Sequence, residues 1–586
     1  MNEENLNRPF RLSKEQIKDN ITKATLFLRN QKIDALYITS NDLYLNEYTP
    51  LEECHRYYFS GFTGSVADLL ILSTGKVLLF VDGRYHQQAD LETDPNKVEV
   101  FKCPYGVSPY NALKNQIKDH KIKKLGIEGQ RTPFNSALDI ESICSVISID
   151  ENQFAQVIAF QSAPCLGEAY LLSKEITGED LKNKLSRATQ NCENLFLTAL
   201  DSIAWLTNAR GYQLPYQSTY RTKALATTNK IFLFMPKETL IHSSLQNHPQ
   251  INIVRTKYHQ LAQEIKKLQE QKLIQGDSIS CEFDRITASD YQSLADTFRK
   301  ENVIDLPKGI LPLHAFKNNI EIGQMEISFK NADQAIFNTI KWVKENINSE
   351  VQISELEYYH KANAYYLETG RKAQSFKTIA AVGPNSSIIH FNSPSSDVII
   401  KKNELILLDS GAFYECGLAT DCTRTFLSGG EATSLQKKIY TLVLKSLLSV
   451  QNAIFPEGST GSFIDGVARM PMLLHGHNYA HGTGHGVGIN VHEGMYSVVP
   501  TSNTPLYAGL VGSLEPGIYL PGIGGVRLEN ICVVEKHTTF AGMLRFRPLS
   551  FVGFDPALID KDLMNNDEIR WLENYQIECK ERGTAR

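Results

Sequence analysis

The first half of the chain repeats one pattern of apolar and polar positions. Asp34–Tyr48 and Asn194–Gly211 each follow a helical pattern. A strand-like run of β-branched and aromatic residues comes after each of them, Lys76–Tyr85 after the first and Lys230–Met235 after the second. This echo predicts two similar α/β domains in tandem. The alternative stays open, because α/β proteins alternate strand, turn and helix by default.

The pattern changes near residue 313, where amphipathic helices begin to alternate with strand-and-turn segments rich in acidic residues and glycine. That order is typical of an α+β domain, in which helices cover one face of an antiparallel sheet. We therefore expect α/β domains over residues 1–158 and 159–312 and an α+β domain over residues 313–586. At about 150 residues per domain, the length of 586 residues allows this division.

Several segments of the last domain have the apolar spacing of helices. One of them opens with Ser-Glu-Leu-Glu at Ser354, which has the form of a capping box. Another carries an apolar stripe made of Leu435, Ile439, Leu442, Val443 and Leu447. The predicted helices cover residues 319–347, 354–368, 434–454 and 567–582.

Composition and charge narrow the classes of function. Hydrophobic residues make up 42% of the chain, charged residues 21%, and the net charge is −5. These values are ordinary for a globular protein, and no basic stripe indicates a nucleic-acid or anionic-membrane partner. Met1–Gln16 contains no apolar h-region, and no apolar run has transmembrane length. The ten cysteines are scattered without a CxxC pair, which favours reduced thiols and a cytoplasmic location.

Two acidic residues lie at strand ends in the segment NELILLDSGAFYECGLATDCTRTF. The apolar run 405–408 leads into Asp409, and after a glycine-containing turn a second strand carries Asp421. A hairpin of this length brings the two carboxylates side by side. Two ionised carboxylates in an apolar setting repel each other, so they need a cation or a shared proton. Alternation along the strand should turn Cys422 to the opposite face, where it packs.

A second hairpin repeats the arrangement with Glu515 and Glu529 around the turn LPGIGG. For a single acid, a salt bridge such as one from Arg527, or a strand edge facing water, is the more common explanation. Four acids on two hairpins beside a histidine-rich stretch favour metal instead. Four carboxylates carry a formal charge that two divalent cations balance. Oxygen-rich coordination with one imidazole suits Mn²⁺, with Co²⁺, Zn²⁺ and Fe²⁺ as alternatives.

The histidine-rich stretch HGTGHGVGINVHEG contains His481, His485 and His492. Three histidines invite the hypothesis of a three-histidine zinc site, and the spacing of the first two resembles that of HExxH. Gly482 and Gly484 are poor helix formers, however. The stretch therefore predicts strand and turn, with glycines that let backbone and substrate approach closely.

Together these motifs resemble the metal-dependent pita-bread peptidases, the group of methionine aminopeptidases, prolidases and aminopeptidase P, in which Asp, Asp, His, Glu and Glu follow in that chain order. The long, three-domain Xaa-Pro aminopeptidases are the most similar branch. The shared motifs are GFTGS, VDGRY, SFKTIAAVGPNSSIIHF, LLDSGA, TDCTRTF, HGTGHGVG, VHEG, EPGIY, VRLEN and FRPLSFVGFDPALIDKDL. The resemblance implies two creatinase-like α/β domains and a pita-bread catalytic domain with a C-terminal extension.

The resemblance also implies a role for each matching residue. The implied metal ligands are Asp409, Asp421, His485, Glu515 and Glu529, with Asp421 and Glu529 bridging two ions. His390, His481 and His492 are implied to act on the substrate and the transition state, and Arg527 to support the bridging glutamate. The implied reaction releases the N-terminal residue from peptides with proline second, by metal-activated water, in a homodimer.

Two spacings depart from the long form. The gap from Asp409 to Asp421 is one residue longer, inside a turn that should tolerate it. The segment from His485 to His492 is two residues shorter and resembles that of short aminopeptidase P and prolidases. The placement of His492 is therefore a question for the structure.

Three rival functions differ in testable ways. Prolidases cleave only dipeptides, and their chains usually have one N-terminal domain, which the length of this chain argues against. Creatinase-like amidinohydrolases share the fold but lack this ligand set. Catalytically inactive pita-bread proteins that bind peptides or partners lose ligands, whereas this chain keeps all five.

Overall fold

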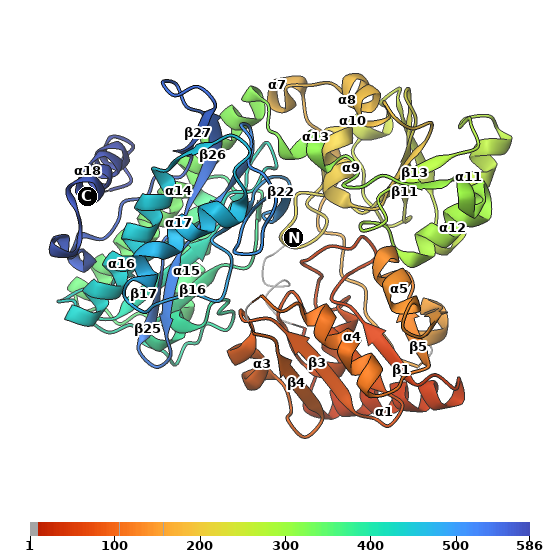
Figure 1. The fold of residues 1–586 in the computed structure, drawn as a ribbon, viewed down its shortest axis with the longest axis horizontal. Coiled ribbons are helices and arrows are strands. Elements are labelled where there is room, and N and C mark those ends of the chain that lie inside the picture. The colour runs from red at the N-terminus through yellow and green to blue at the C-terminus, as the bar shows by residue number, and fades with distance from the viewer. Residues whose placement is uncertain (1–9, 105, 156, 586) are drawn as a thin grey trace. The chain divides into compact units, whose positions relative to one another are not determined.

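The computed structural model describes residues 10–104, 106–155 and 157–585 (Figure 1). It divides into an N-terminal unit (Met1–Leu171, Leu181–Pro215 and Thr219–Ile310) and a C-terminal unit (Leu172–Asp180, Tyr216–Ser218 and Leu311–Arg586). Residues 1–9 of the N-terminal stretch without an h-region lie outside the described residues. Within the described ranges, no helix has both the length and the apolar character needed to span a membrane.

The N-terminal unit opens with a mixed sheet of strand order β4-β3-β2-β1-β5-β6. The pairs β1–β2 and β2–β3 are antiparallel, and β3–β4, β1–β5 and β5–β6 are parallel. The strands are β1 (Ala35–Ile38), β2 (Asp68–Leu72), β3 (Val77–Val81), β4 (Val98–Lys102), β5 (Lys124–Glu128) and β6 (Ser145–Ile149). Its helices are α1 (Lys14–Asn30), α2 (His55–Ser60), α3 (His86–Glu92), α4 (Pro109–Asp119), α5 (Phe134–Glu141) and α6 (Glu151–Ala155). The predicted strand-like run after residue 76 is β3, which is buried throughout, as expected for a strand covered on both faces.

A second sheet of the same unit repeats this topology, with strand order β12-β11-β10-β8-β13-β14. The directions also match, since β8–β10 and β10–β11 are antiparallel and β11–β12, β8–β13 and β13–β14 are parallel. Its strands are β8 (Leu195–Leu197), β10 (Lys223–Ala226), β11 (Ile231–Met235), β12 (Ile251–Arg255), β13 (Ile279–Cys281) and β14 (Val303–Asp305). Its main helices are α8 (Leu181–Ala188), α9 (Leu200–Thr207), α11 (Leu261–Glu270) and α12 (Ala288–Phe298). Two sheets with identical order and direction support duplication over chance repetition.

The C-terminal unit is built on two larger antiparallel sheets, of order β16-β17-β19 and β20-β27-β26-β23-β21-β22. The first contains β16 (Ile379–Val382), β17 (Leu405–Ser410) and β19 (Cys422–Leu427); the second contains β20 (Ile454–Pro456), β21 (Gly484–Gly486), β22 (Glu493–Val498), β23 (Val511–Leu514), β26 (Asn530–Lys536) and β27 (Met543–Pro548). Two short two-stranded antiparallel sheets pair β15 (Ala373–Gln374) with β18 (Ala412–Phe413), and β24 (Gly517–Leu520) with β25 (Gly524–Arg527). The α+β architecture is as predicted.

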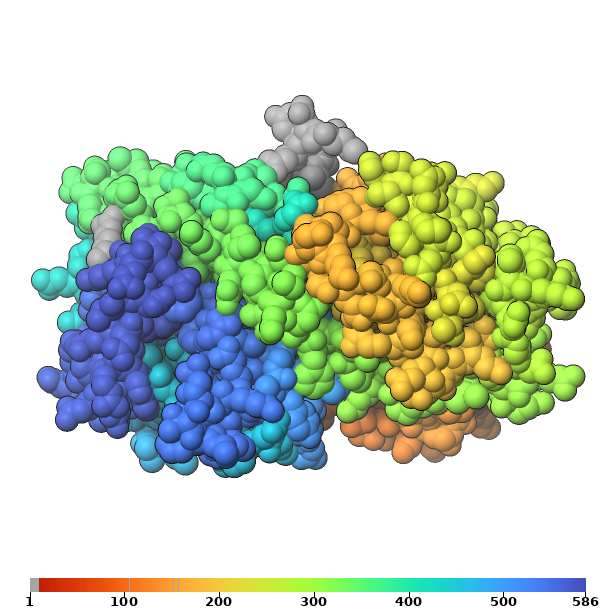
Figure 2. Space-filling model, turned by 90° about the horizontal axis from the view of Figure 1, so that it is seen from above, coloured from red at the N-terminus to blue at the C-terminus, as the bar shows by residue number. Residues whose placement is uncertain are grey.

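Helices cover both of these sheets. The helices are α13 (Leu311–Ala315), α14 (Asn319–Asn348), α15 (Glu355–Glu368), α16 (Ser434–Gln451), α17 (Gly461–Leu473) and α18 (Asn566–Glu581). α14 and α15 share a buried apolar cluster with β16, β17 and β19. α16, α17 and α18 share another with β23, β26 and β27. Figure 2 shows α18, in dark blue, at the surface of the C-terminal unit.

The helix predictions for the C-terminal unit hold with two corrections. The helical pattern predicted over Asp34–Tyr48 is wrong, because its first residues form the buried strand β1 and no helix follows before Tyr48. The capping box at Ser354 is present, with Glu357 as its partner, and opens α15. α16 ends at Gln451 rather than at residue 454, because Ile454 enters β20. Leu435 is 40% exposed, so it does not belong to the buried stripe of α16, whereas Leu447 is fully buried.

Candidate metal centre

Asp409 and Asp421 come from two neighbouring strands. Asp409 lies near the end of β17, and Asp421 directly precedes β19. The strands pair antiparallel with Asp409 opposite Thr423, and side chains two apart on a strand share a face, so Asp421 and Asp409 face the same side. Cys422, which lies between Asp421 and Thr423 on the strand, points the other way. It joins the apolar cluster under α14 and α15, which confirms its packing role.

Glu515 and Glu529 come from the two arms of one long hairpin. Leu514 pairs with Asn530 in the β23–β26 ladder, and Gly517 pairs with Arg527 in the β24–β25 ladder. Both ladders keep one register, so Glu515 and Glu529 lie opposite each other in the gap between them. The ladder is interrupted there, which leaves the two carboxylates room to turn toward the site.

His485 enters from β21, in the strand-and-turn conformation that the glycines predicted. β21 lies between β22 and β23, and a Cβ on Gly484 would lie 2.0 Å from the Ser513 carbonyl oxygen. Only glycine fits that approach. His485 Nδ1 lies 3.1 Å from the Gly486 carbonyl oxygen, which can only accept, so Nδ1 carries the proton. Nε2 then presents its lone pair toward the carboxylates, as a metal ligand requires.

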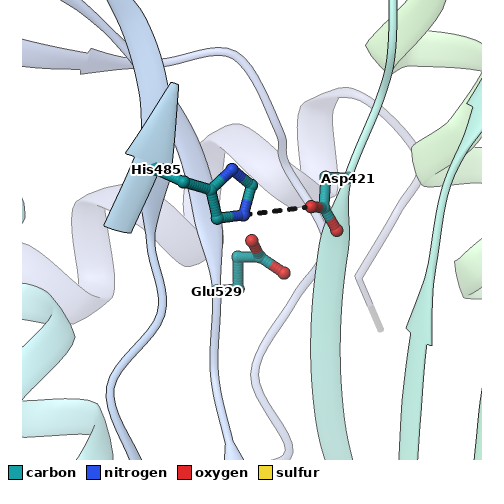
Figure 3. Close-up of side chains that lie close together, drawn as sticks. All are labelled: Asp421, His485 and Glu529. Carbon is teal, nitrogen blue, oxygen red and sulfur yellow. Dashed lines mark ion pairs between the residues drawn. The ribbon is translucent and has the colours of Figure 1, made fainter. Parts of the chain in front are cut away.

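The ligand atoms converge. His485 Nε2 lies 3.6 Å from Asp421 Oδ2 and 3.5 Å from Glu515 Oε1. One ligand atom from each of Asp421, His485 and Glu529 lies within 4.8 Å of the others, and Figure 3 shows the imidazole pointing at Asp421 with Glu529 beside it. An ion with bonds of about 2.2 Å closes such a span with small side-chain movements.

The charges at this site are unbalanced without cations. Asp409, Asp421 and Glu529 are nearly buried, and one carboxylate oxygen of each (Oδ1, Oδ1 and Oε1) is buried without a hydrogen-bond partner. Burial and the neighbouring acids raise the pKa of Asp421 and Glu515 well above the ordinary range. Burial and Asp409 raise the pKa of Glu529 to about 8. Orphaned buried carboxylate oxygens of this kind fit bound divalent cations, which would replace the protons.

The family resemblance implied that Arg527 supports Glu529, but its direct ion-pair partner is Asp409. Its guanidinium forms an ion pair with Asp409, with Nη2 2.6 Å from Oδ2. It reaches Glu529 through Thr423, since Nε donates to Thr423 Oγ1 at 3.2 Å and that hydroxyl donates to Glu529 Oε2 at 2.9 Å. Arg527 therefore orients acids on both hairpins at once.

Tyr519 links this arginine to His481, a contact that sequence reasoning missed. Arg527 Nη1 donates to the Tyr519 hydroxyl at 2.9 Å, and that hydroxyl lies 2.9 Å from His481 Nε2. His481 Nδ1 lies 2.7 Å from the Gly482 carbonyl oxygen, so Nδ1 carries the proton and Nε2 accepts from the tyrosine. The signal in the sequence was EPGIY, in which Tyr519 follows Glu515 by four residues.

The other two predicted histidines, His492 and His390, are placed by their contacts with His485 and by the contact of a neighbouring residue with Arg527. The His492 ring lies 4.3 Å from the His485 ring at 79°, so the short connecting segment still places it beside the metal-binding imidazole proposed here. His390 is half-buried, and the carbonyl of its neighbour Ile389 accepts from Arg527 at 3.3 Å. In the part of the chain that the structure describes, the metal-sized group contains His485 alone of the three histidines of the stretch, which argues against a three-histidine zinc site.

Comparisons with known proteins show the family of the chain. The sequence model of metallopeptidase family M24 matches residues 324–536. A probable Xaa-Pro aminopeptidase P from Laccaria bicolor is 30% identical over 96% of this chain and 89% of its own length. The chain belongs to metallopeptidase family M24. Its similarity to the long, three-domain Xaa-Pro aminopeptidases extends to a probable Xaa-Pro aminopeptidase P from Aspergillus niger, 29% identical over 96% of this chain and 95% of the relative.

The other parts of this M24 protein also match known domains. Creatinase/prolidase N-terminal domain models match residues 21–154 and 161–321, and the C-terminal region of M24 peptidases matches residues 542–584. The crystal structure of X-prolyl aminopeptidase from Caenorhabditis elegans, described as a cytosolic enzyme with a dinuclear active site, has the same fold. It has a TM-score of 0.86 at 24% identity and covers 97% of this chain and 96% of its own. The predicted fold class, two creatinase-like domains followed by a pita-bread domain, is confirmed.

Proposed function

We propose that this protein is an Xaa-Pro aminopeptidase, which releases the N-terminal residue from peptides with proline in the second position. The observation that carries the proposal is the group of Asp421, His485 and Glu529 at metal-binding distance, with the carboxylates of Glu515 and Asp409 beside it. It occurs in a chain that is 30% identical to a probable Xaa-Pro aminopeptidase P over 96% of its length. Arg527 contacts residues of both hairpins, which supports a binding site with a defined geometry rather than a chance grouping of acidic residues.

We infer two divalent ions per chain. Asp421 and Glu529 would contribute to both ions, Asp409 would hold one of them, and His485 and Glu515 would hold the other. Oxygen-rich donors with one imidazole favour Mn²⁺. When bound, the ions supply a water-derived nucleophile near neutral pH and polarise the scissile carbonyl.

The chain's own residues orient the substrate and handle protons. The free α-amine of a peptide would bind beside the acidic cluster, and this contact would select for an N-terminus. His481 and Tyr519 form a hydrogen-bonded pair that can pass or hold a proton for the leaving nitrogen. We assign to His390 and His492 the contacts with the substrate that the family resemblance implies. A proline nitrogen offers no hydrogen in the intact peptide, so ring shape and backbone geometry must select it.

We also propose that the enzyme is a cytoplasmic homodimer. α17 and its C-cap residue expose four large apolar side chains, Phe463, Met470, Leu473 and Leu474, with 55%, 55%, 49% and 76% of their surfaces accessible. The first, second and fourth follow at intervals of seven and four, which places them on one helix face. Contiguous exposed apolar surface commonly marks a protein interface. A second copy of this chain is the occupant that the family resemblance favours.

A substrate panel tests the proposal. Recombinant protein with added Mn²⁺ is assayed on X-Pro-Y tripeptides, X-Pro dipeptides and X-Ala-Y controls. We expect release of the first residue from X-Pro-Y and little from X-Ala-Y. Cleavage of X-Pro dipeptides alone would favour a prolidase, and equal cleavage of X-Ala-Y would refute proline selectivity. Asp421→Asn should abolish turnover in the same assay, and full activity of this variant would remove Asp421 from the bridging role.

A further inference from the structure

A buried ion cluster joins the end of the histidine-rich stretch to the segment around α13. Glu493 follows His492 and begins β22, and its carboxylate accepts a hydrogen bond from Lys317 Nζ and lies 3.1 Å from His314 Nδ1. The side chains of all three residues are at most 2% exposed. Sequence reasoning assigned no role to any of them, although Glu493 stands in the motif VHEG.

Lys317 anchors the segment that leads from α13 into α14. Besides Glu493, it donates to the carbonyl oxygens of His314 and Ala315 at 2.7 and 3.3 Å. The contact between α13 and β22 is close, since a Cβ on Gly494 would lie 2.5 Å from Leu311 Cδ2. The cation therefore joins the turn after α13 to the start of the strand that follows His492.

Glu493 also supports the loop between His485 and His492. A Cβ on Gly488 would lie 2.1 Å from Glu493 Oε1, so the carboxylate passes directly beneath this loop. The Gly488 carbonyl oxygen in turn accepts from the Ala419 amide at 2.7 Å, two residues before Asp421. The carboxylate thus holds the segment that sets the His492 ring against the His485 ring.

A buried ion pair adds little net stability, because desolvation offsets most of the attraction. Its directional contacts are what distinguish it from apolar packing of the same volume. Here those contacts reach two backbone carbonyls and one carboxylate, and they fix both the turn after α13 and the first residue of β22.

We propose that Glu493 and Lys317 are positioning residues for the reaction, which act by holding His492 in place beside His485. Both side chains are buried, and we assign neither of them a contact with the substrate. The inference rests on the proposed aminopeptidase function. It assigns to the α13 segment a role in setting the geometry of the catalytic histidine.

The test compares Lys317→Met with a matched control, Lys344→Met. Lys344 forms an ion pair of 2.6 Å with the buried Asp555 in the same unit, on the far end of α14 from Lys317. We expect Lys317→Met to lower kcat on X-Pro-Y about 10-fold to 100-fold, with two ions retained and a smaller change in KM. Lys344→Met breaks an ion pair of the same unit that does not reach His492, and it should keep its kcat.

Combination with His492→Ala separates positioning from a general loss of structure. If Lys317 acts through His492, Lys317→Met lowers kcat no further in the His492→Ala background, but keeps its full effect in the His481→Ala background. An equal fall of kcat in both backgrounds, or an unchanged kcat in Lys317→Met itself, would overturn the proposal. If Lys317→Met does not fold, Glu493→Gln, which keeps the side-chain shape, carries the same expectation and the same contrary outcome. Lack of turnover by the unaltered protein would refute the proposed function instead, so the two failures are distinguishable.

Discussion

The metal-free protein should become less stable as the pH rises from 5 to 7.5, and Glu529 should account for a defined part of that loss. Burial and Asp409 raise the pKa of Glu529 from 4.5 to about 8. Between these values the folded chain keeps a proton that the unfolded chain releases. Each pH unit then lowers the free energy of unfolding by about 1.4 kcal/mol, or about 3 kcal/mol over this range.

The substitution Glu529→Gln isolates this contribution, because glutamine does not titrate. Urea unfolding of the EDTA-treated protein can be followed by tryptophan fluorescence. A Trp205→Phe background leaves Trp342 and Trp571, which both report on the C-terminal unit. The stability of the parent relative to Glu529→Gln should fall by about 3 kcal/mol from pH 5 to pH 7.5. If the difference in the free energy of unfolding between the two proteins stays constant or rises with pH, Glu529 is not buried in its protonated form in the metal-free protein.

Saturating Mn²⁺ should reverse the trend. Metal ligands must be deprotonated, so affinity rises with pH and the loaded parent gains stability where the metal-free parent loses it. Glu529→Gln should gain much less from the same ion concentration. Equal stabilisation of both proteins by Mn²⁺ would place the ion elsewhere.

Three further substitutions test separate contacts. Arg527→Met leaves Asp409 buried without its ion-pair partner, and should lower the free energy of unfolding of the metal-free protein by about 3–5 kcal/mol; a loss below 1 kcal/mol would contradict this. Tyr519→Phe removes the hydroxyl that His481 Nε2 accepts from, and should lower kcat about 10-fold or more while both ions stay bound, as metal analysis can show. Met470→Glu places a charge on the apolar face of α17 and should yield a monomer by light scattering, whereas an unchanged dimer would exclude that face as the interface.

Much of the fold followed from local patterns. The apolar runs that became β3 and β11 were predictable because strands covered on both faces read as continuous hydrophobic segments. The capping box at Ser354 fixed the start of α15. Alternation alone predicted that Cys422 packs away from its acidic neighbour. The exposure of Leu435 was not predictable, since spacing gives the apolar face of a helix but not how far the core extends along it.

Part of the candidate site was also predictable from the sequence, and part was not. Turn length and register bring Asp409 near Asp421, and Glu515 opposite Glu529, so each pair was accessible from sequence. The long-range contacts around these pairs were not accessible from the sequence. Arg527 reaches Asp409 across 118 residues, and Lys317 reaches Glu493 across 176. Contacts over such separations depend on how sheets and helices pack, and no local pattern encodes them.

The most direct test of the dinuclear centre is anomalous diffraction at the manganese edge from crystals soaked in Mn²⁺. Two peaks about 3.5 Å apart are expected, with Asp421 and Glu529 touching both, Asp409 touching one, and His485 and Glu515 touching the other. A single peak held by Asp421, His485 and Glu529, or peaks away from these five residues, would contradict the account.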